Sequence, residues 1–277
     1  MSILEAATAI ADAAPDHPSP RRVATEPVTL RRLISSERVK LSTLRSTWIT
    51  FAVAFAGMVA VGTLSSWAMT SQRTLPRDFS PISQSLAGVD LAQLAIAVVA
   101  VLAITGEYAT GMIRSTMSAE PRRLPVVWAK LAVFSAATFL VMLVAAFVSF
   151  FAAQAVMGSH STTIGASHAL RSVIGVALYL TVAGAIAMGL GFLTRSTAGG
   201  IAATFALLLV LPVLGNVLPA SWQSHILPYL PSNAGNSLVG VHPVLGALSP
   251  WAGFAVMCLW AGAALAAGAW RLLRQDV

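Results

Sequence analysis

Six long apolar runs, separated by short polar stretches, constrain this chain more than any other feature of its sequence. Each run is about as long as the roughly 20 residues that a helix needs to cross a hydrocarbon core about 30 Å thick. The runs are apolar on every face, so their backbone groups must bond within helices rather than in a barrel. With 57% apolar and only 10% charged residues, the composition excludes a soluble globular protein. The predicted spans are 48–66, 88–106, 131–157, 172–193, 197–218 and 251–270.

The sequence therefore predicts an all-α, polytopic membrane protein, and its basic residues predict the orientation. Lys and Arg are retained on the cytoplasmic side, close to the spans. Most of the 17 Lys and Arg residues fall on one side, and only Arg73, Arg77 and Arg171 fall on the other. We expect a plasma-membrane protein with both termini in the cytoplasm. The pI near 10.7 reflects this topology and contact with anionic lipid of the bilayer, and no separate basic face suggests nucleic acid.

Within and around the predicted transmembrane domain, 48–270, several segments differ in character. Residues 1–27 lack a long apolar core and predict a disordered cytoplasmic tail, and 271–277 form a short cytoplasmic tail. Residues 28–47 place leucines at helical spacing among basic residues, which predicts an amphipathic interfacial helix. Residues 219–250 have aromatic side chains but no Lys, Arg, Asp or Glu. This composition predicts short, re-entrant-like helices at the outer interface.

Polar residues inside the predicted spans are few. Asp90 and Gln93, near the outer end of the second span, have the spacing of a helix N-terminal capping pair. Pro212 predicts a kink in the fifth span. No acidic residue falls near the middle of a span, which argues against a proton- or sodium-driven carrier.

The sequence carries no pattern of a catalytic or metal-binding site. The five His residues are scattered without metal-ligand spacing, and the single Cys258 excludes an intramolecular disulfide. No phosphate-binding loop of the form GxxxxGK[ST] occurs. We therefore expect no enzyme activity, cofactor or metal in this chain, and any ATP hydrolysis would belong to a partner subunit.

The insert GEYATGMIRSTMSAEPRRLPVVWAK, residues 106–130, lies on the predicted cytoplasmic side, where a soluble partner could bind a membrane subunit. Residues 110–117 are expected to form a short helix that Pro121 ends. Glu107 and Arg114 stand two helical turns apart, on a similar face. Composition alone fits a solvated, positively charged loop equally well.

Four stretches of the sequence resemble the membrane subunits of type-2 ATP-binding-cassette (ABC) exporters of the actinobacterial type. They are ERVKLSTLRSTW before the first span, the insert with Lys130, LGFLTRSTAGGIAA between the fourth and fifth spans, and YLPSNAG before the last span. The resemblance extends over roughly 29–274. In the insert, the residues that match the family's pattern are Glu107, Gly111, Arg114, Pro121, Arg123 and Lys130.

This resemblance implies a permease subunit that forms an export path for an apolar or amphipathic substrate. A second permease subunit, identical or paired, would complete the path, and a separate cytoplasmic ABC ATPase would supply the energy. The resemblance makes 107–130 the coupling loop and 28–47 the connecting helix. The partner-coupling residues predicted in this way are Glu107, Gly111, Met112, Ile113, Arg114, Pro121, Arg122 and Arg123.

Two other functions fit the same topology. A non-transporting membrane scaffold, or an immunity-type protein, would recruit a soluble partner through the same insert. A secondary carrier is disfavoured by the lack of ionisable groups near the middle of the spans. Association with an ATPase would distinguish the exporter from the scaffold.

Overall fold

Six helices of the computed structural model are long and apolar enough to cross a membrane, which confirms the predicted fold class. The structure describes residues 29–72, 74–76, 79–113, 123–240 and 246–274, and within these ranges it contains no β-strand. The long helices are α3 (Arg45–Thr70), α5 (Val89–Ala109), α7 (Arg123–Met157), α8 (Ala169–Thr194) and α13 (Pro250–Arg274), together with the composite fifth span of α9 (Thr197–Phe205), η2 (Ala206–Val210) and α10 (Leu211–Gly215). The short helices are α2 (Leu30–Thr43), α4 (Pro81–Ser85), η1 (Gly158–His160), α11 (Ala220–Ile226), η3 (Leu227–Tyr229) and α12 (Pro231–Val239).

The helices extend beyond the apolar runs that predicted them. The third span was expected from residue 131, but α7 begins at Arg123 and has 35 residues. At 1.5 Å per residue it is about 50 Å long, well over the thickness of a hydrocarbon core. Its first turns read RLPVVWAK, which is apolar between the two charged ends, and Pro125 falls in the first turn, where a helix tolerates proline. The amphipathic segment predicted before the first span forms α2, which Leu44, in an extended conformation, separates from α3.

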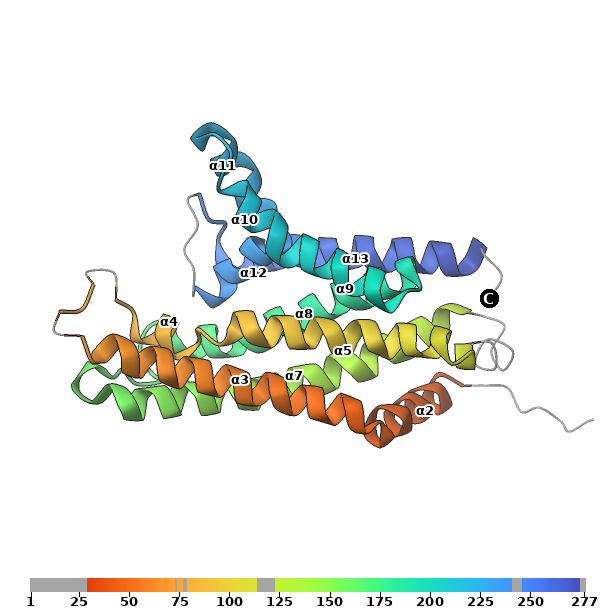
Figure 1. Cartoon of the computed structure of the whole chain (residues 1–277), viewed down its shortest axis with the longest axis horizontal. Helices are drawn as coiled ribbons and strands as arrows, with labels where there is room; N and C mark the ends of the chain where they lie inside the picture. The colour runs from red at the N-terminus through yellow and green to blue at the C-terminus, as the bar shows by residue number, and fades with distance from the viewer. Residues whose placement is uncertain (1–28, 73, 77–78, 114–122, 241–245, 275–277) are drawn as a thin grey trace, which may run out of the picture.

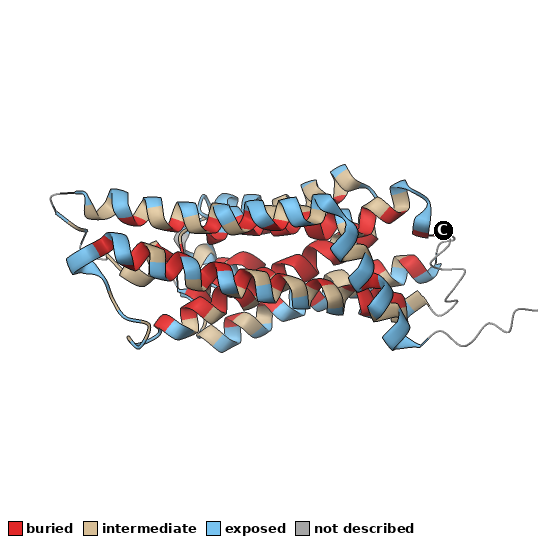
Figure 2. Ribbon diagram, turned by 90° about the horizontal axis from the view of Figure 1, so that it is seen from below, coloured by how far each residue is buried: buried red, intermediate tan, exposed pale blue. Residues whose placement is uncertain are grey.

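Helix α8 lies at the centre of the bundle. In the most apolar 18 residues of α8, 72% of the residues are buried, compared with 22% in α3, in the fifth span and in α13. Small residues permit this central position, because a Cβ on Gly189 would lie 2.5 Å from the backbone of α13. Buried residues face the inside of the bundle along the long helices (Figure 2).

The fifth span is interrupted immediately before Pro212, as the sequence predicted. The N–H of Leu211 bonds to the carbonyl of Ala206, five residues back, which is the π-helical pattern. Proline has no N–H to donate and crowds the preceding turn, so the helix widens there. Beyond this point α10 and α11 lead away from the long helices (Figure 1). Their outer residues, such as Val213 and Val217, are exposed in the single chain.

The uncharged segment after the fifth span contains the expected short helices α11, η3 and α12. Helix α12 is largely buried and packs against α8 and α13. A Cβ on Gly235 would collide with the ring of Tyr179, so only glycine permits this approach. This part of the segment is therefore integral to the bundle.

The predicted capping role of Asp90 and Gln93 is wrong. The N-cap of α5 is Gly88, which has no side chain to offer, and Asp90 lies within the first turn. The reason is the tight turn from α4, whose backbone is already helical at Gly88. Gln93 is buried and accepts a hydrogen bond from the hydroxyl of Tyr179 on α8. Gln93 therefore joins the second span to the fourth.

Both ends of the described chain lie at the same end of the bundle, which we call the base (Figure 1). The base also contains the last turns of α5, α8 and α13 and the first turns of α7 (Figure 1). Helix α2 runs across it at an angle to the long helices. Helix α2 and the described ends of the insert thus meet at the base.

Candidate functional site

The inner face of α2 carries an acidic residue. The helix begins at the N-cap Thr29, whose hydroxyl accepts a hydrogen bond from the N–H of Arg32 at 3.4 Å. Leu33, Glu37 and Leu41 recur every four residues and therefore share a face. The two leucines pack against the bundle core, and Glu37 between them is only 8% exposed. A carboxylate buried in this way needs cationic partners.

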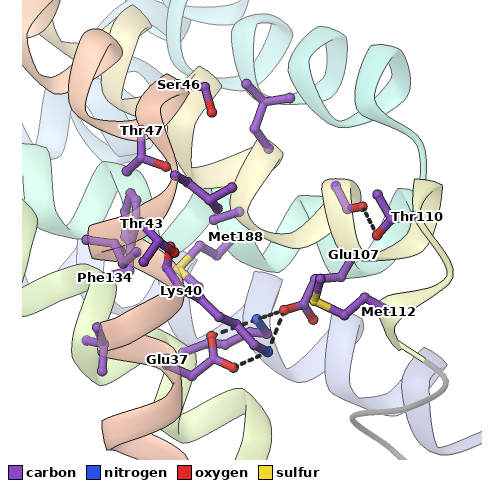
Figure 3. A pocket seen from close by; sticks show the side chains of 17 residues that line it. Glu37, Lys40, Thr43, Ser46, Thr47, Glu107, Thr110, Met112, Phe134 and Met188 are labelled. Atoms are coloured by element: carbon purple, nitrogen blue, oxygen red, sulfur yellow. Dashed lines mark hydrogen bonds and ion pairs between the residues drawn. The ribbon is translucent and has the colours of Figure 1, made fainter.

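Two glutamates and two lysines from three helices provide these partners for one another (Figure 3). The ammonium group of Lys130 on α7 donates to Glu37 Oε2 at 2.8 Å and to Glu107 Oε1 at 2.6 Å. The ammonium group of Lys40 on α2 donates to Glu37 Oε1 at 2.8 Å and to Glu107 Oε1 at 2.9 Å. We call Glu37, Lys40, Glu107 and Lys130 the charge cluster. Its formal charges cancel.

Glu107 is held close to the C-terminal end of its helix. Helix α5 ends at Ala109, and Gly111 follows with a φ of +71°, a conformation that glycine adopts without strain. Carbonyl groups at a helix C-terminus favour cations and disfavour a carboxylate. The two lysines therefore offset an unfavourable position of Glu107, which is 8% exposed.

The environment of Lys40 favours its charged form. Partial burial lowers the pKa of this ammonium group, but hydrogen bonds to Glu37 and Glu107 and their negative charges outweigh that effect. The pKa of Lys40 is therefore raised above its ordinary value of 10.5. Lys40 therefore stays charged at neutral pH, and its ion pairs with Glu37 and Glu107 join α2 to the end of α5.

The charge cluster joins α2 to both spans that flank the insert. Glu37 and Lys40 come from α2, Glu107 from the end of α5, and Lys130 from the third turn of α7. Lys130 is 5% exposed, so removal of one charge would leave another buried without its partner. Breaking a buried pair in this way costs about 3–5 kcal/mol. Motion of one of these elements is therefore coupled to the other two.

A cavity of about 460 Å³ opens beside the charge cluster (Figure 3). Its wall combines the cluster with hydroxyl groups and apolar side chains. Glu107 Oε2 is buried and has no hydrogen-bond partner among the described residues. The other residues of the wall are Leu41, Thr43, Leu44, Ser46, Thr47, Leu102, Ala103, Gly106, Thr110, Met112, Val133, Phe134 and Met188.

Three arginines tie other helix ends together at the base. Arg195, in a left-handed conformation at the C-cap of α8, donates to the carbonyl of Arg271 on α13 at 3.1 Å. Arg271 donates in return to the carbonyl of Leu193 on α8. Arg123, at the start of α7, donates to the carbonyl of Leu272. Cations at helix C-termini satisfy carbonyl groups that lack helical partners, so α7, α8 and α13 are joined at their ends.

The structure separates the predicted coupling residues into groups. Glu107 is in the charge cluster and Arg123 is in the arginine group, so both bond within the chain. Ile113 is 2% exposed and packs in the chain's own core, whereas Met112 is 46% exposed. The structure makes Gly111 the turn that ends α5. Three predicted residues lie outside the described residues: Arg114, Pro121 and Arg122.

Sequence reasoning missed the partners of Glu107 as site residues. Lys130 was noted only as part of the family pattern, and Glu37 and Lys40 only within the amphipathic segment and the stretch ERVKLSTLRSTW. One signal was available, because Glu37 falls at the helical spacing of Leu33 and Leu41. An acid on the apolar face of an amphipathic helix predicts a buried ion pair.

The chemistry of the cluster is electrostatic. Its carboxylates are engaged by ammonium groups, and these four side chains include no hydroxyl or thiol nucleophile. Over the part of the chain that the structure describes, no three His, Cys, Asp or Glu side chains are placed to hold a metal ion. The arrangement can hold α2, α5 and α7 against one another, and displacement of one charge would shift these helices relative to each other.

These features define a class of protein, a multi-pass helical membrane subunit in which the helix before the first span is tied to the two spans flanking a polar insert. The family of ABC-2 transporter proteins matches residues 33–212, from α2 into α10, and the chain belongs to this family. The matched range includes all four residues of the charge cluster. Proteins of this family are membrane components that normally lack ATPase activity. A comparison with curated proteins gave no match.

Proposed function

We propose that this chain is the permease subunit of an ABC exporter and that it forms, with a second permease subunit, the path for an apolar or amphipathic substrate. Family membership in the ABC-2 transporters supports this function and implies an ATPase partner in general. The sequence has no phosphate-binding loop of its own, so uphill transport requires energy from another chain. The partner is a separate cytoplasmic ABC ATPase.

One observation carries the proposal, namely the charge cluster at the base. It joins the helix before the first span to the second and third spans through four hydrogen bonds of 2.6–2.9 Å. A protein that binds the base and displaces α2 or the insert therefore acts on both spans. An electrostatic tie of this kind converts nucleotide-driven movement of a docked ATPase into movement of the spans.

The docking surface includes the insert 107–130 and the outer face of α2. Met112 is exposed at the start of the insert and contacts the ATPase. Arg114, Pro121 and Arg122, which the family resemblance predicts as coupling residues, are proposed as further contacts of the ATPase. Glu107 has a different role from the one expected, since it holds the start of the insert against α2 and α7 from inside. Gly111, Ile113 and Arg123 fix the described ends of the insert.

The base faces the cytoplasm of a cell whose plasma membrane holds the protein. The basic residues at the base support this orientation, because Lys and Arg are retained on the cytoplasmic side. The second permease subunit is a copy of this chain or a paralogue. The exposed apolar face of α10, with Val213 and Leu214, supports contact with either a partner subunit or lipid.

Purification of the tagged protein from its native membrane, followed by mass spectrometry, tests the partnership. A stoichiometric soluble subunit with a phosphate-binding loop is expected. Recovery without an ATPase, under conditions that preserve a control transporter, would instead favour the scaffold.

The coupling role is tested with Glu107→Gln in the reconstituted complex. This change preserves shape but removes the charge that two lysines neutralise, so transport-linked ATPase activity should fall while membrane insertion stays intact. Asp90→Asn is the matched control, because it neutralises an acid at the opposite end of the same helix. Wild-type coupling in Glu107→Gln, or equal loss in both variants, refutes the role of the cluster.

A further inference from the structure

The cavity beside the charge cluster has the features of a ligand site within one subunit. Its volume of about 460 Å³ lies in the range of roughly 300–1,000 Å³ that small-molecule pockets have. It lies between α2, the start of α3, the end of α5, α7 and α8 (Figure 3). Proposed transport does not require this cavity, so the inference is independent of the proposed function.

One buried polar atom of the wall has no hydrogen-bond partner in the part of the chain that the structure describes. Glu107 is 8% exposed, and its Oε1 accepts from both lysines while its Oε2 has no hydrogen-bond partner among the described residues. A carboxylate oxygen out of water is costly to leave unpaired. Contact with a ligand takes a small rotation of Glu107 or of Met112, a flexible side chain that also lines the cavity. The site therefore offers a strong acceptor to a hydrogen-bond donor.

The charge balance of the cluster restricts that donor. Two carboxylates and two ammonium groups already cancel, so a charged ligand would leave a net charge in a largely apolar space. An amine would also meet the nearby Lys40 and Lys130. A carboxylate would meet Glu107 itself. The favoured head group is an uncharged donor, such as a hydroxyl.

The rest of the wall determines the body of the ligand. The wall also includes carbon and sulfur atoms of four apolar side chains, those of Leu102, Val133, Phe134 and Met188. An apolar chain or ring gains free energy by leaving water for such a surface, in proportion to its area. The cavity also lies where α2 meets helices that are long and apolar enough to cross a membrane.

We propose that this cavity binds an uncharged membrane amphiphile, an apolar chain or ring system with a hydroxyl head that donates to Glu107 Oε2. Such a ligand bridges α2 and the ends of α5 and α7. It therefore stabilises the arrangement of the three helices that the charge cluster holds.

Gly106 provides a variant that adds a side chain at the cavity wall without replacing a residue of the cluster. It lines the cavity, and a Cβ at this position would meet nothing within 4 Å. Gly106→Leu adds an apolar side chain in open space and improves helix propensity. Gly262→Leu is the matched control, since Gly262 on α13 is exposed and its Cβ position is equally open.

The experiment uses the full chain in lipid nanodiscs and a long-chain alcohol that carries a photoreactive group in its tail. Labelling is mapped by mass spectrometry, with dodecanol, its methyl ether, dodecylamine and dodecanoate as competitors. Dodecanol should displace the probe from peptides of α5, α7 and α8 that line the cavity. The methyl ether lacks the donor and should compete about tenfold less well, as expected for loss of a hydrogen bond to a charged acceptor.

Gly106→Leu should abolish labelling of the cavity peptides, and Gly262→Leu should leave it unchanged. Equal labelling in the two variants, or equal competition by the alcohol and its methyl ether, overturns the proposal. The comparison of competitors is made on the wild-type chain, so it decides the question even if Gly106→Leu does not fold. Labelling needs neither an ATPase nor a transport substrate, so its failure is distinguishable from failure of the proposed function.

Discussion

Replacement of Lys130 by Met should destabilise the folded chain through electrostatics rather than packing. Lys130 is 5% exposed and donates to both Glu37 and Glu107. Methionine retains the apolar stem and a similar volume, so little packing is lost. The change leaves two buried carboxylates with one ammonium group, that of Lys40.

The magnitude follows from the partners that remain. Removing one member of a buried ion pair costs about 3–5 kcal/mol. Lys40 still bonds to Glu37 and Glu107, and it is partly exposed, so the lower end of this range applies. We expect a loss of about 3 kcal/mol, or roughly a hundredfold in the unfolding equilibrium. The double variant with Glu107→Gln restores charge balance, so its loss should be about 2 kcal/mol smaller than the sum of the single losses.

Unfolding in mixed detergent micelles, followed by tryptophan fluorescence, measures these differences. Arg38→Met on the exposed face of α2 is the matched control and should change stability by less than about 0.5 kcal/mol. The reasoning is refuted if Lys130→Met behaves like this control. It is also refuted if the double variant is additive, because the buried charges would then not interact.

Three further predictions follow from other contacts. Tyr179→Phe should lower the free energy of unfolding by about 1–3 kcal/mol, because the buried carbonyl oxygen of Gln93 loses the hydroxyl that bonds to it. In the same unfolding assay, the double variant with Gln93→Leu should recover stability. Gly189→Ala should lower the free energy of unfolding by about 1–3 kcal/mol, because it forces α8 away from α13. Gly262→Ala, with open space at its Cβ, should be neutral or slightly stabilising. Equal effects of the two changes would contradict the packing argument. The raised pKa of Lys40 means that its stabilising contribution is complete below the ordinary pKa of 10.5 and is lost as pH rises through the folded value. The difference in free energy of unfolding between the wild type and Lys40→Met should therefore be constant from neutral pH to about pH 10 and fall above it. A decline near pH 7 would refute the raised pKa of Lys40.

The membrane fold could be predicted because an apolar run that favours the bilayer also requires a helical backbone. A backbone in hydrocarbon must satisfy its own polar groups, so an apolar run of sufficient length specifies a helix. Pro212 likewise predicted an interruption, since a missing N–H acts locally. The helix ends were less predictable, because α7 begins at Arg123, well before residue 131, where the predicted span begins.

The site was less predictable because it depends on pairing between distant residues. Glu107 and Lys130 are 23 residues apart, and Glu37 and Lys130 are 93 apart. The hydropathy of each segment says nothing about which charges meet. The assignment of Asp90 and Gln93 failed for the same reason, since a spacing of three fits a cap but the partner of Gln93 is Tyr179, 86 residues away.

The charge cluster and the arginine contacts at the base indicate which parts of the fold can move. The charge cluster fixes α2, α5 and α7 to one another, and the arginines fix α7, α8 and α13, with α7 common to both sets. The fifth span is held differently, because its outer half is exposed and its hydrogen bonding is already irregular before Pro212. Force applied at the base is therefore transmitted through a joined set of helix ends, and the more deformable part of the bundle is η2 with α10. We expect hydrogen exchange to be slowest in α8 and faster in the fifth span around 206–215, since local opening follows the density of buried contacts. Equal protection in the two helices would contradict this division between a stiff base and a compliant fifth span.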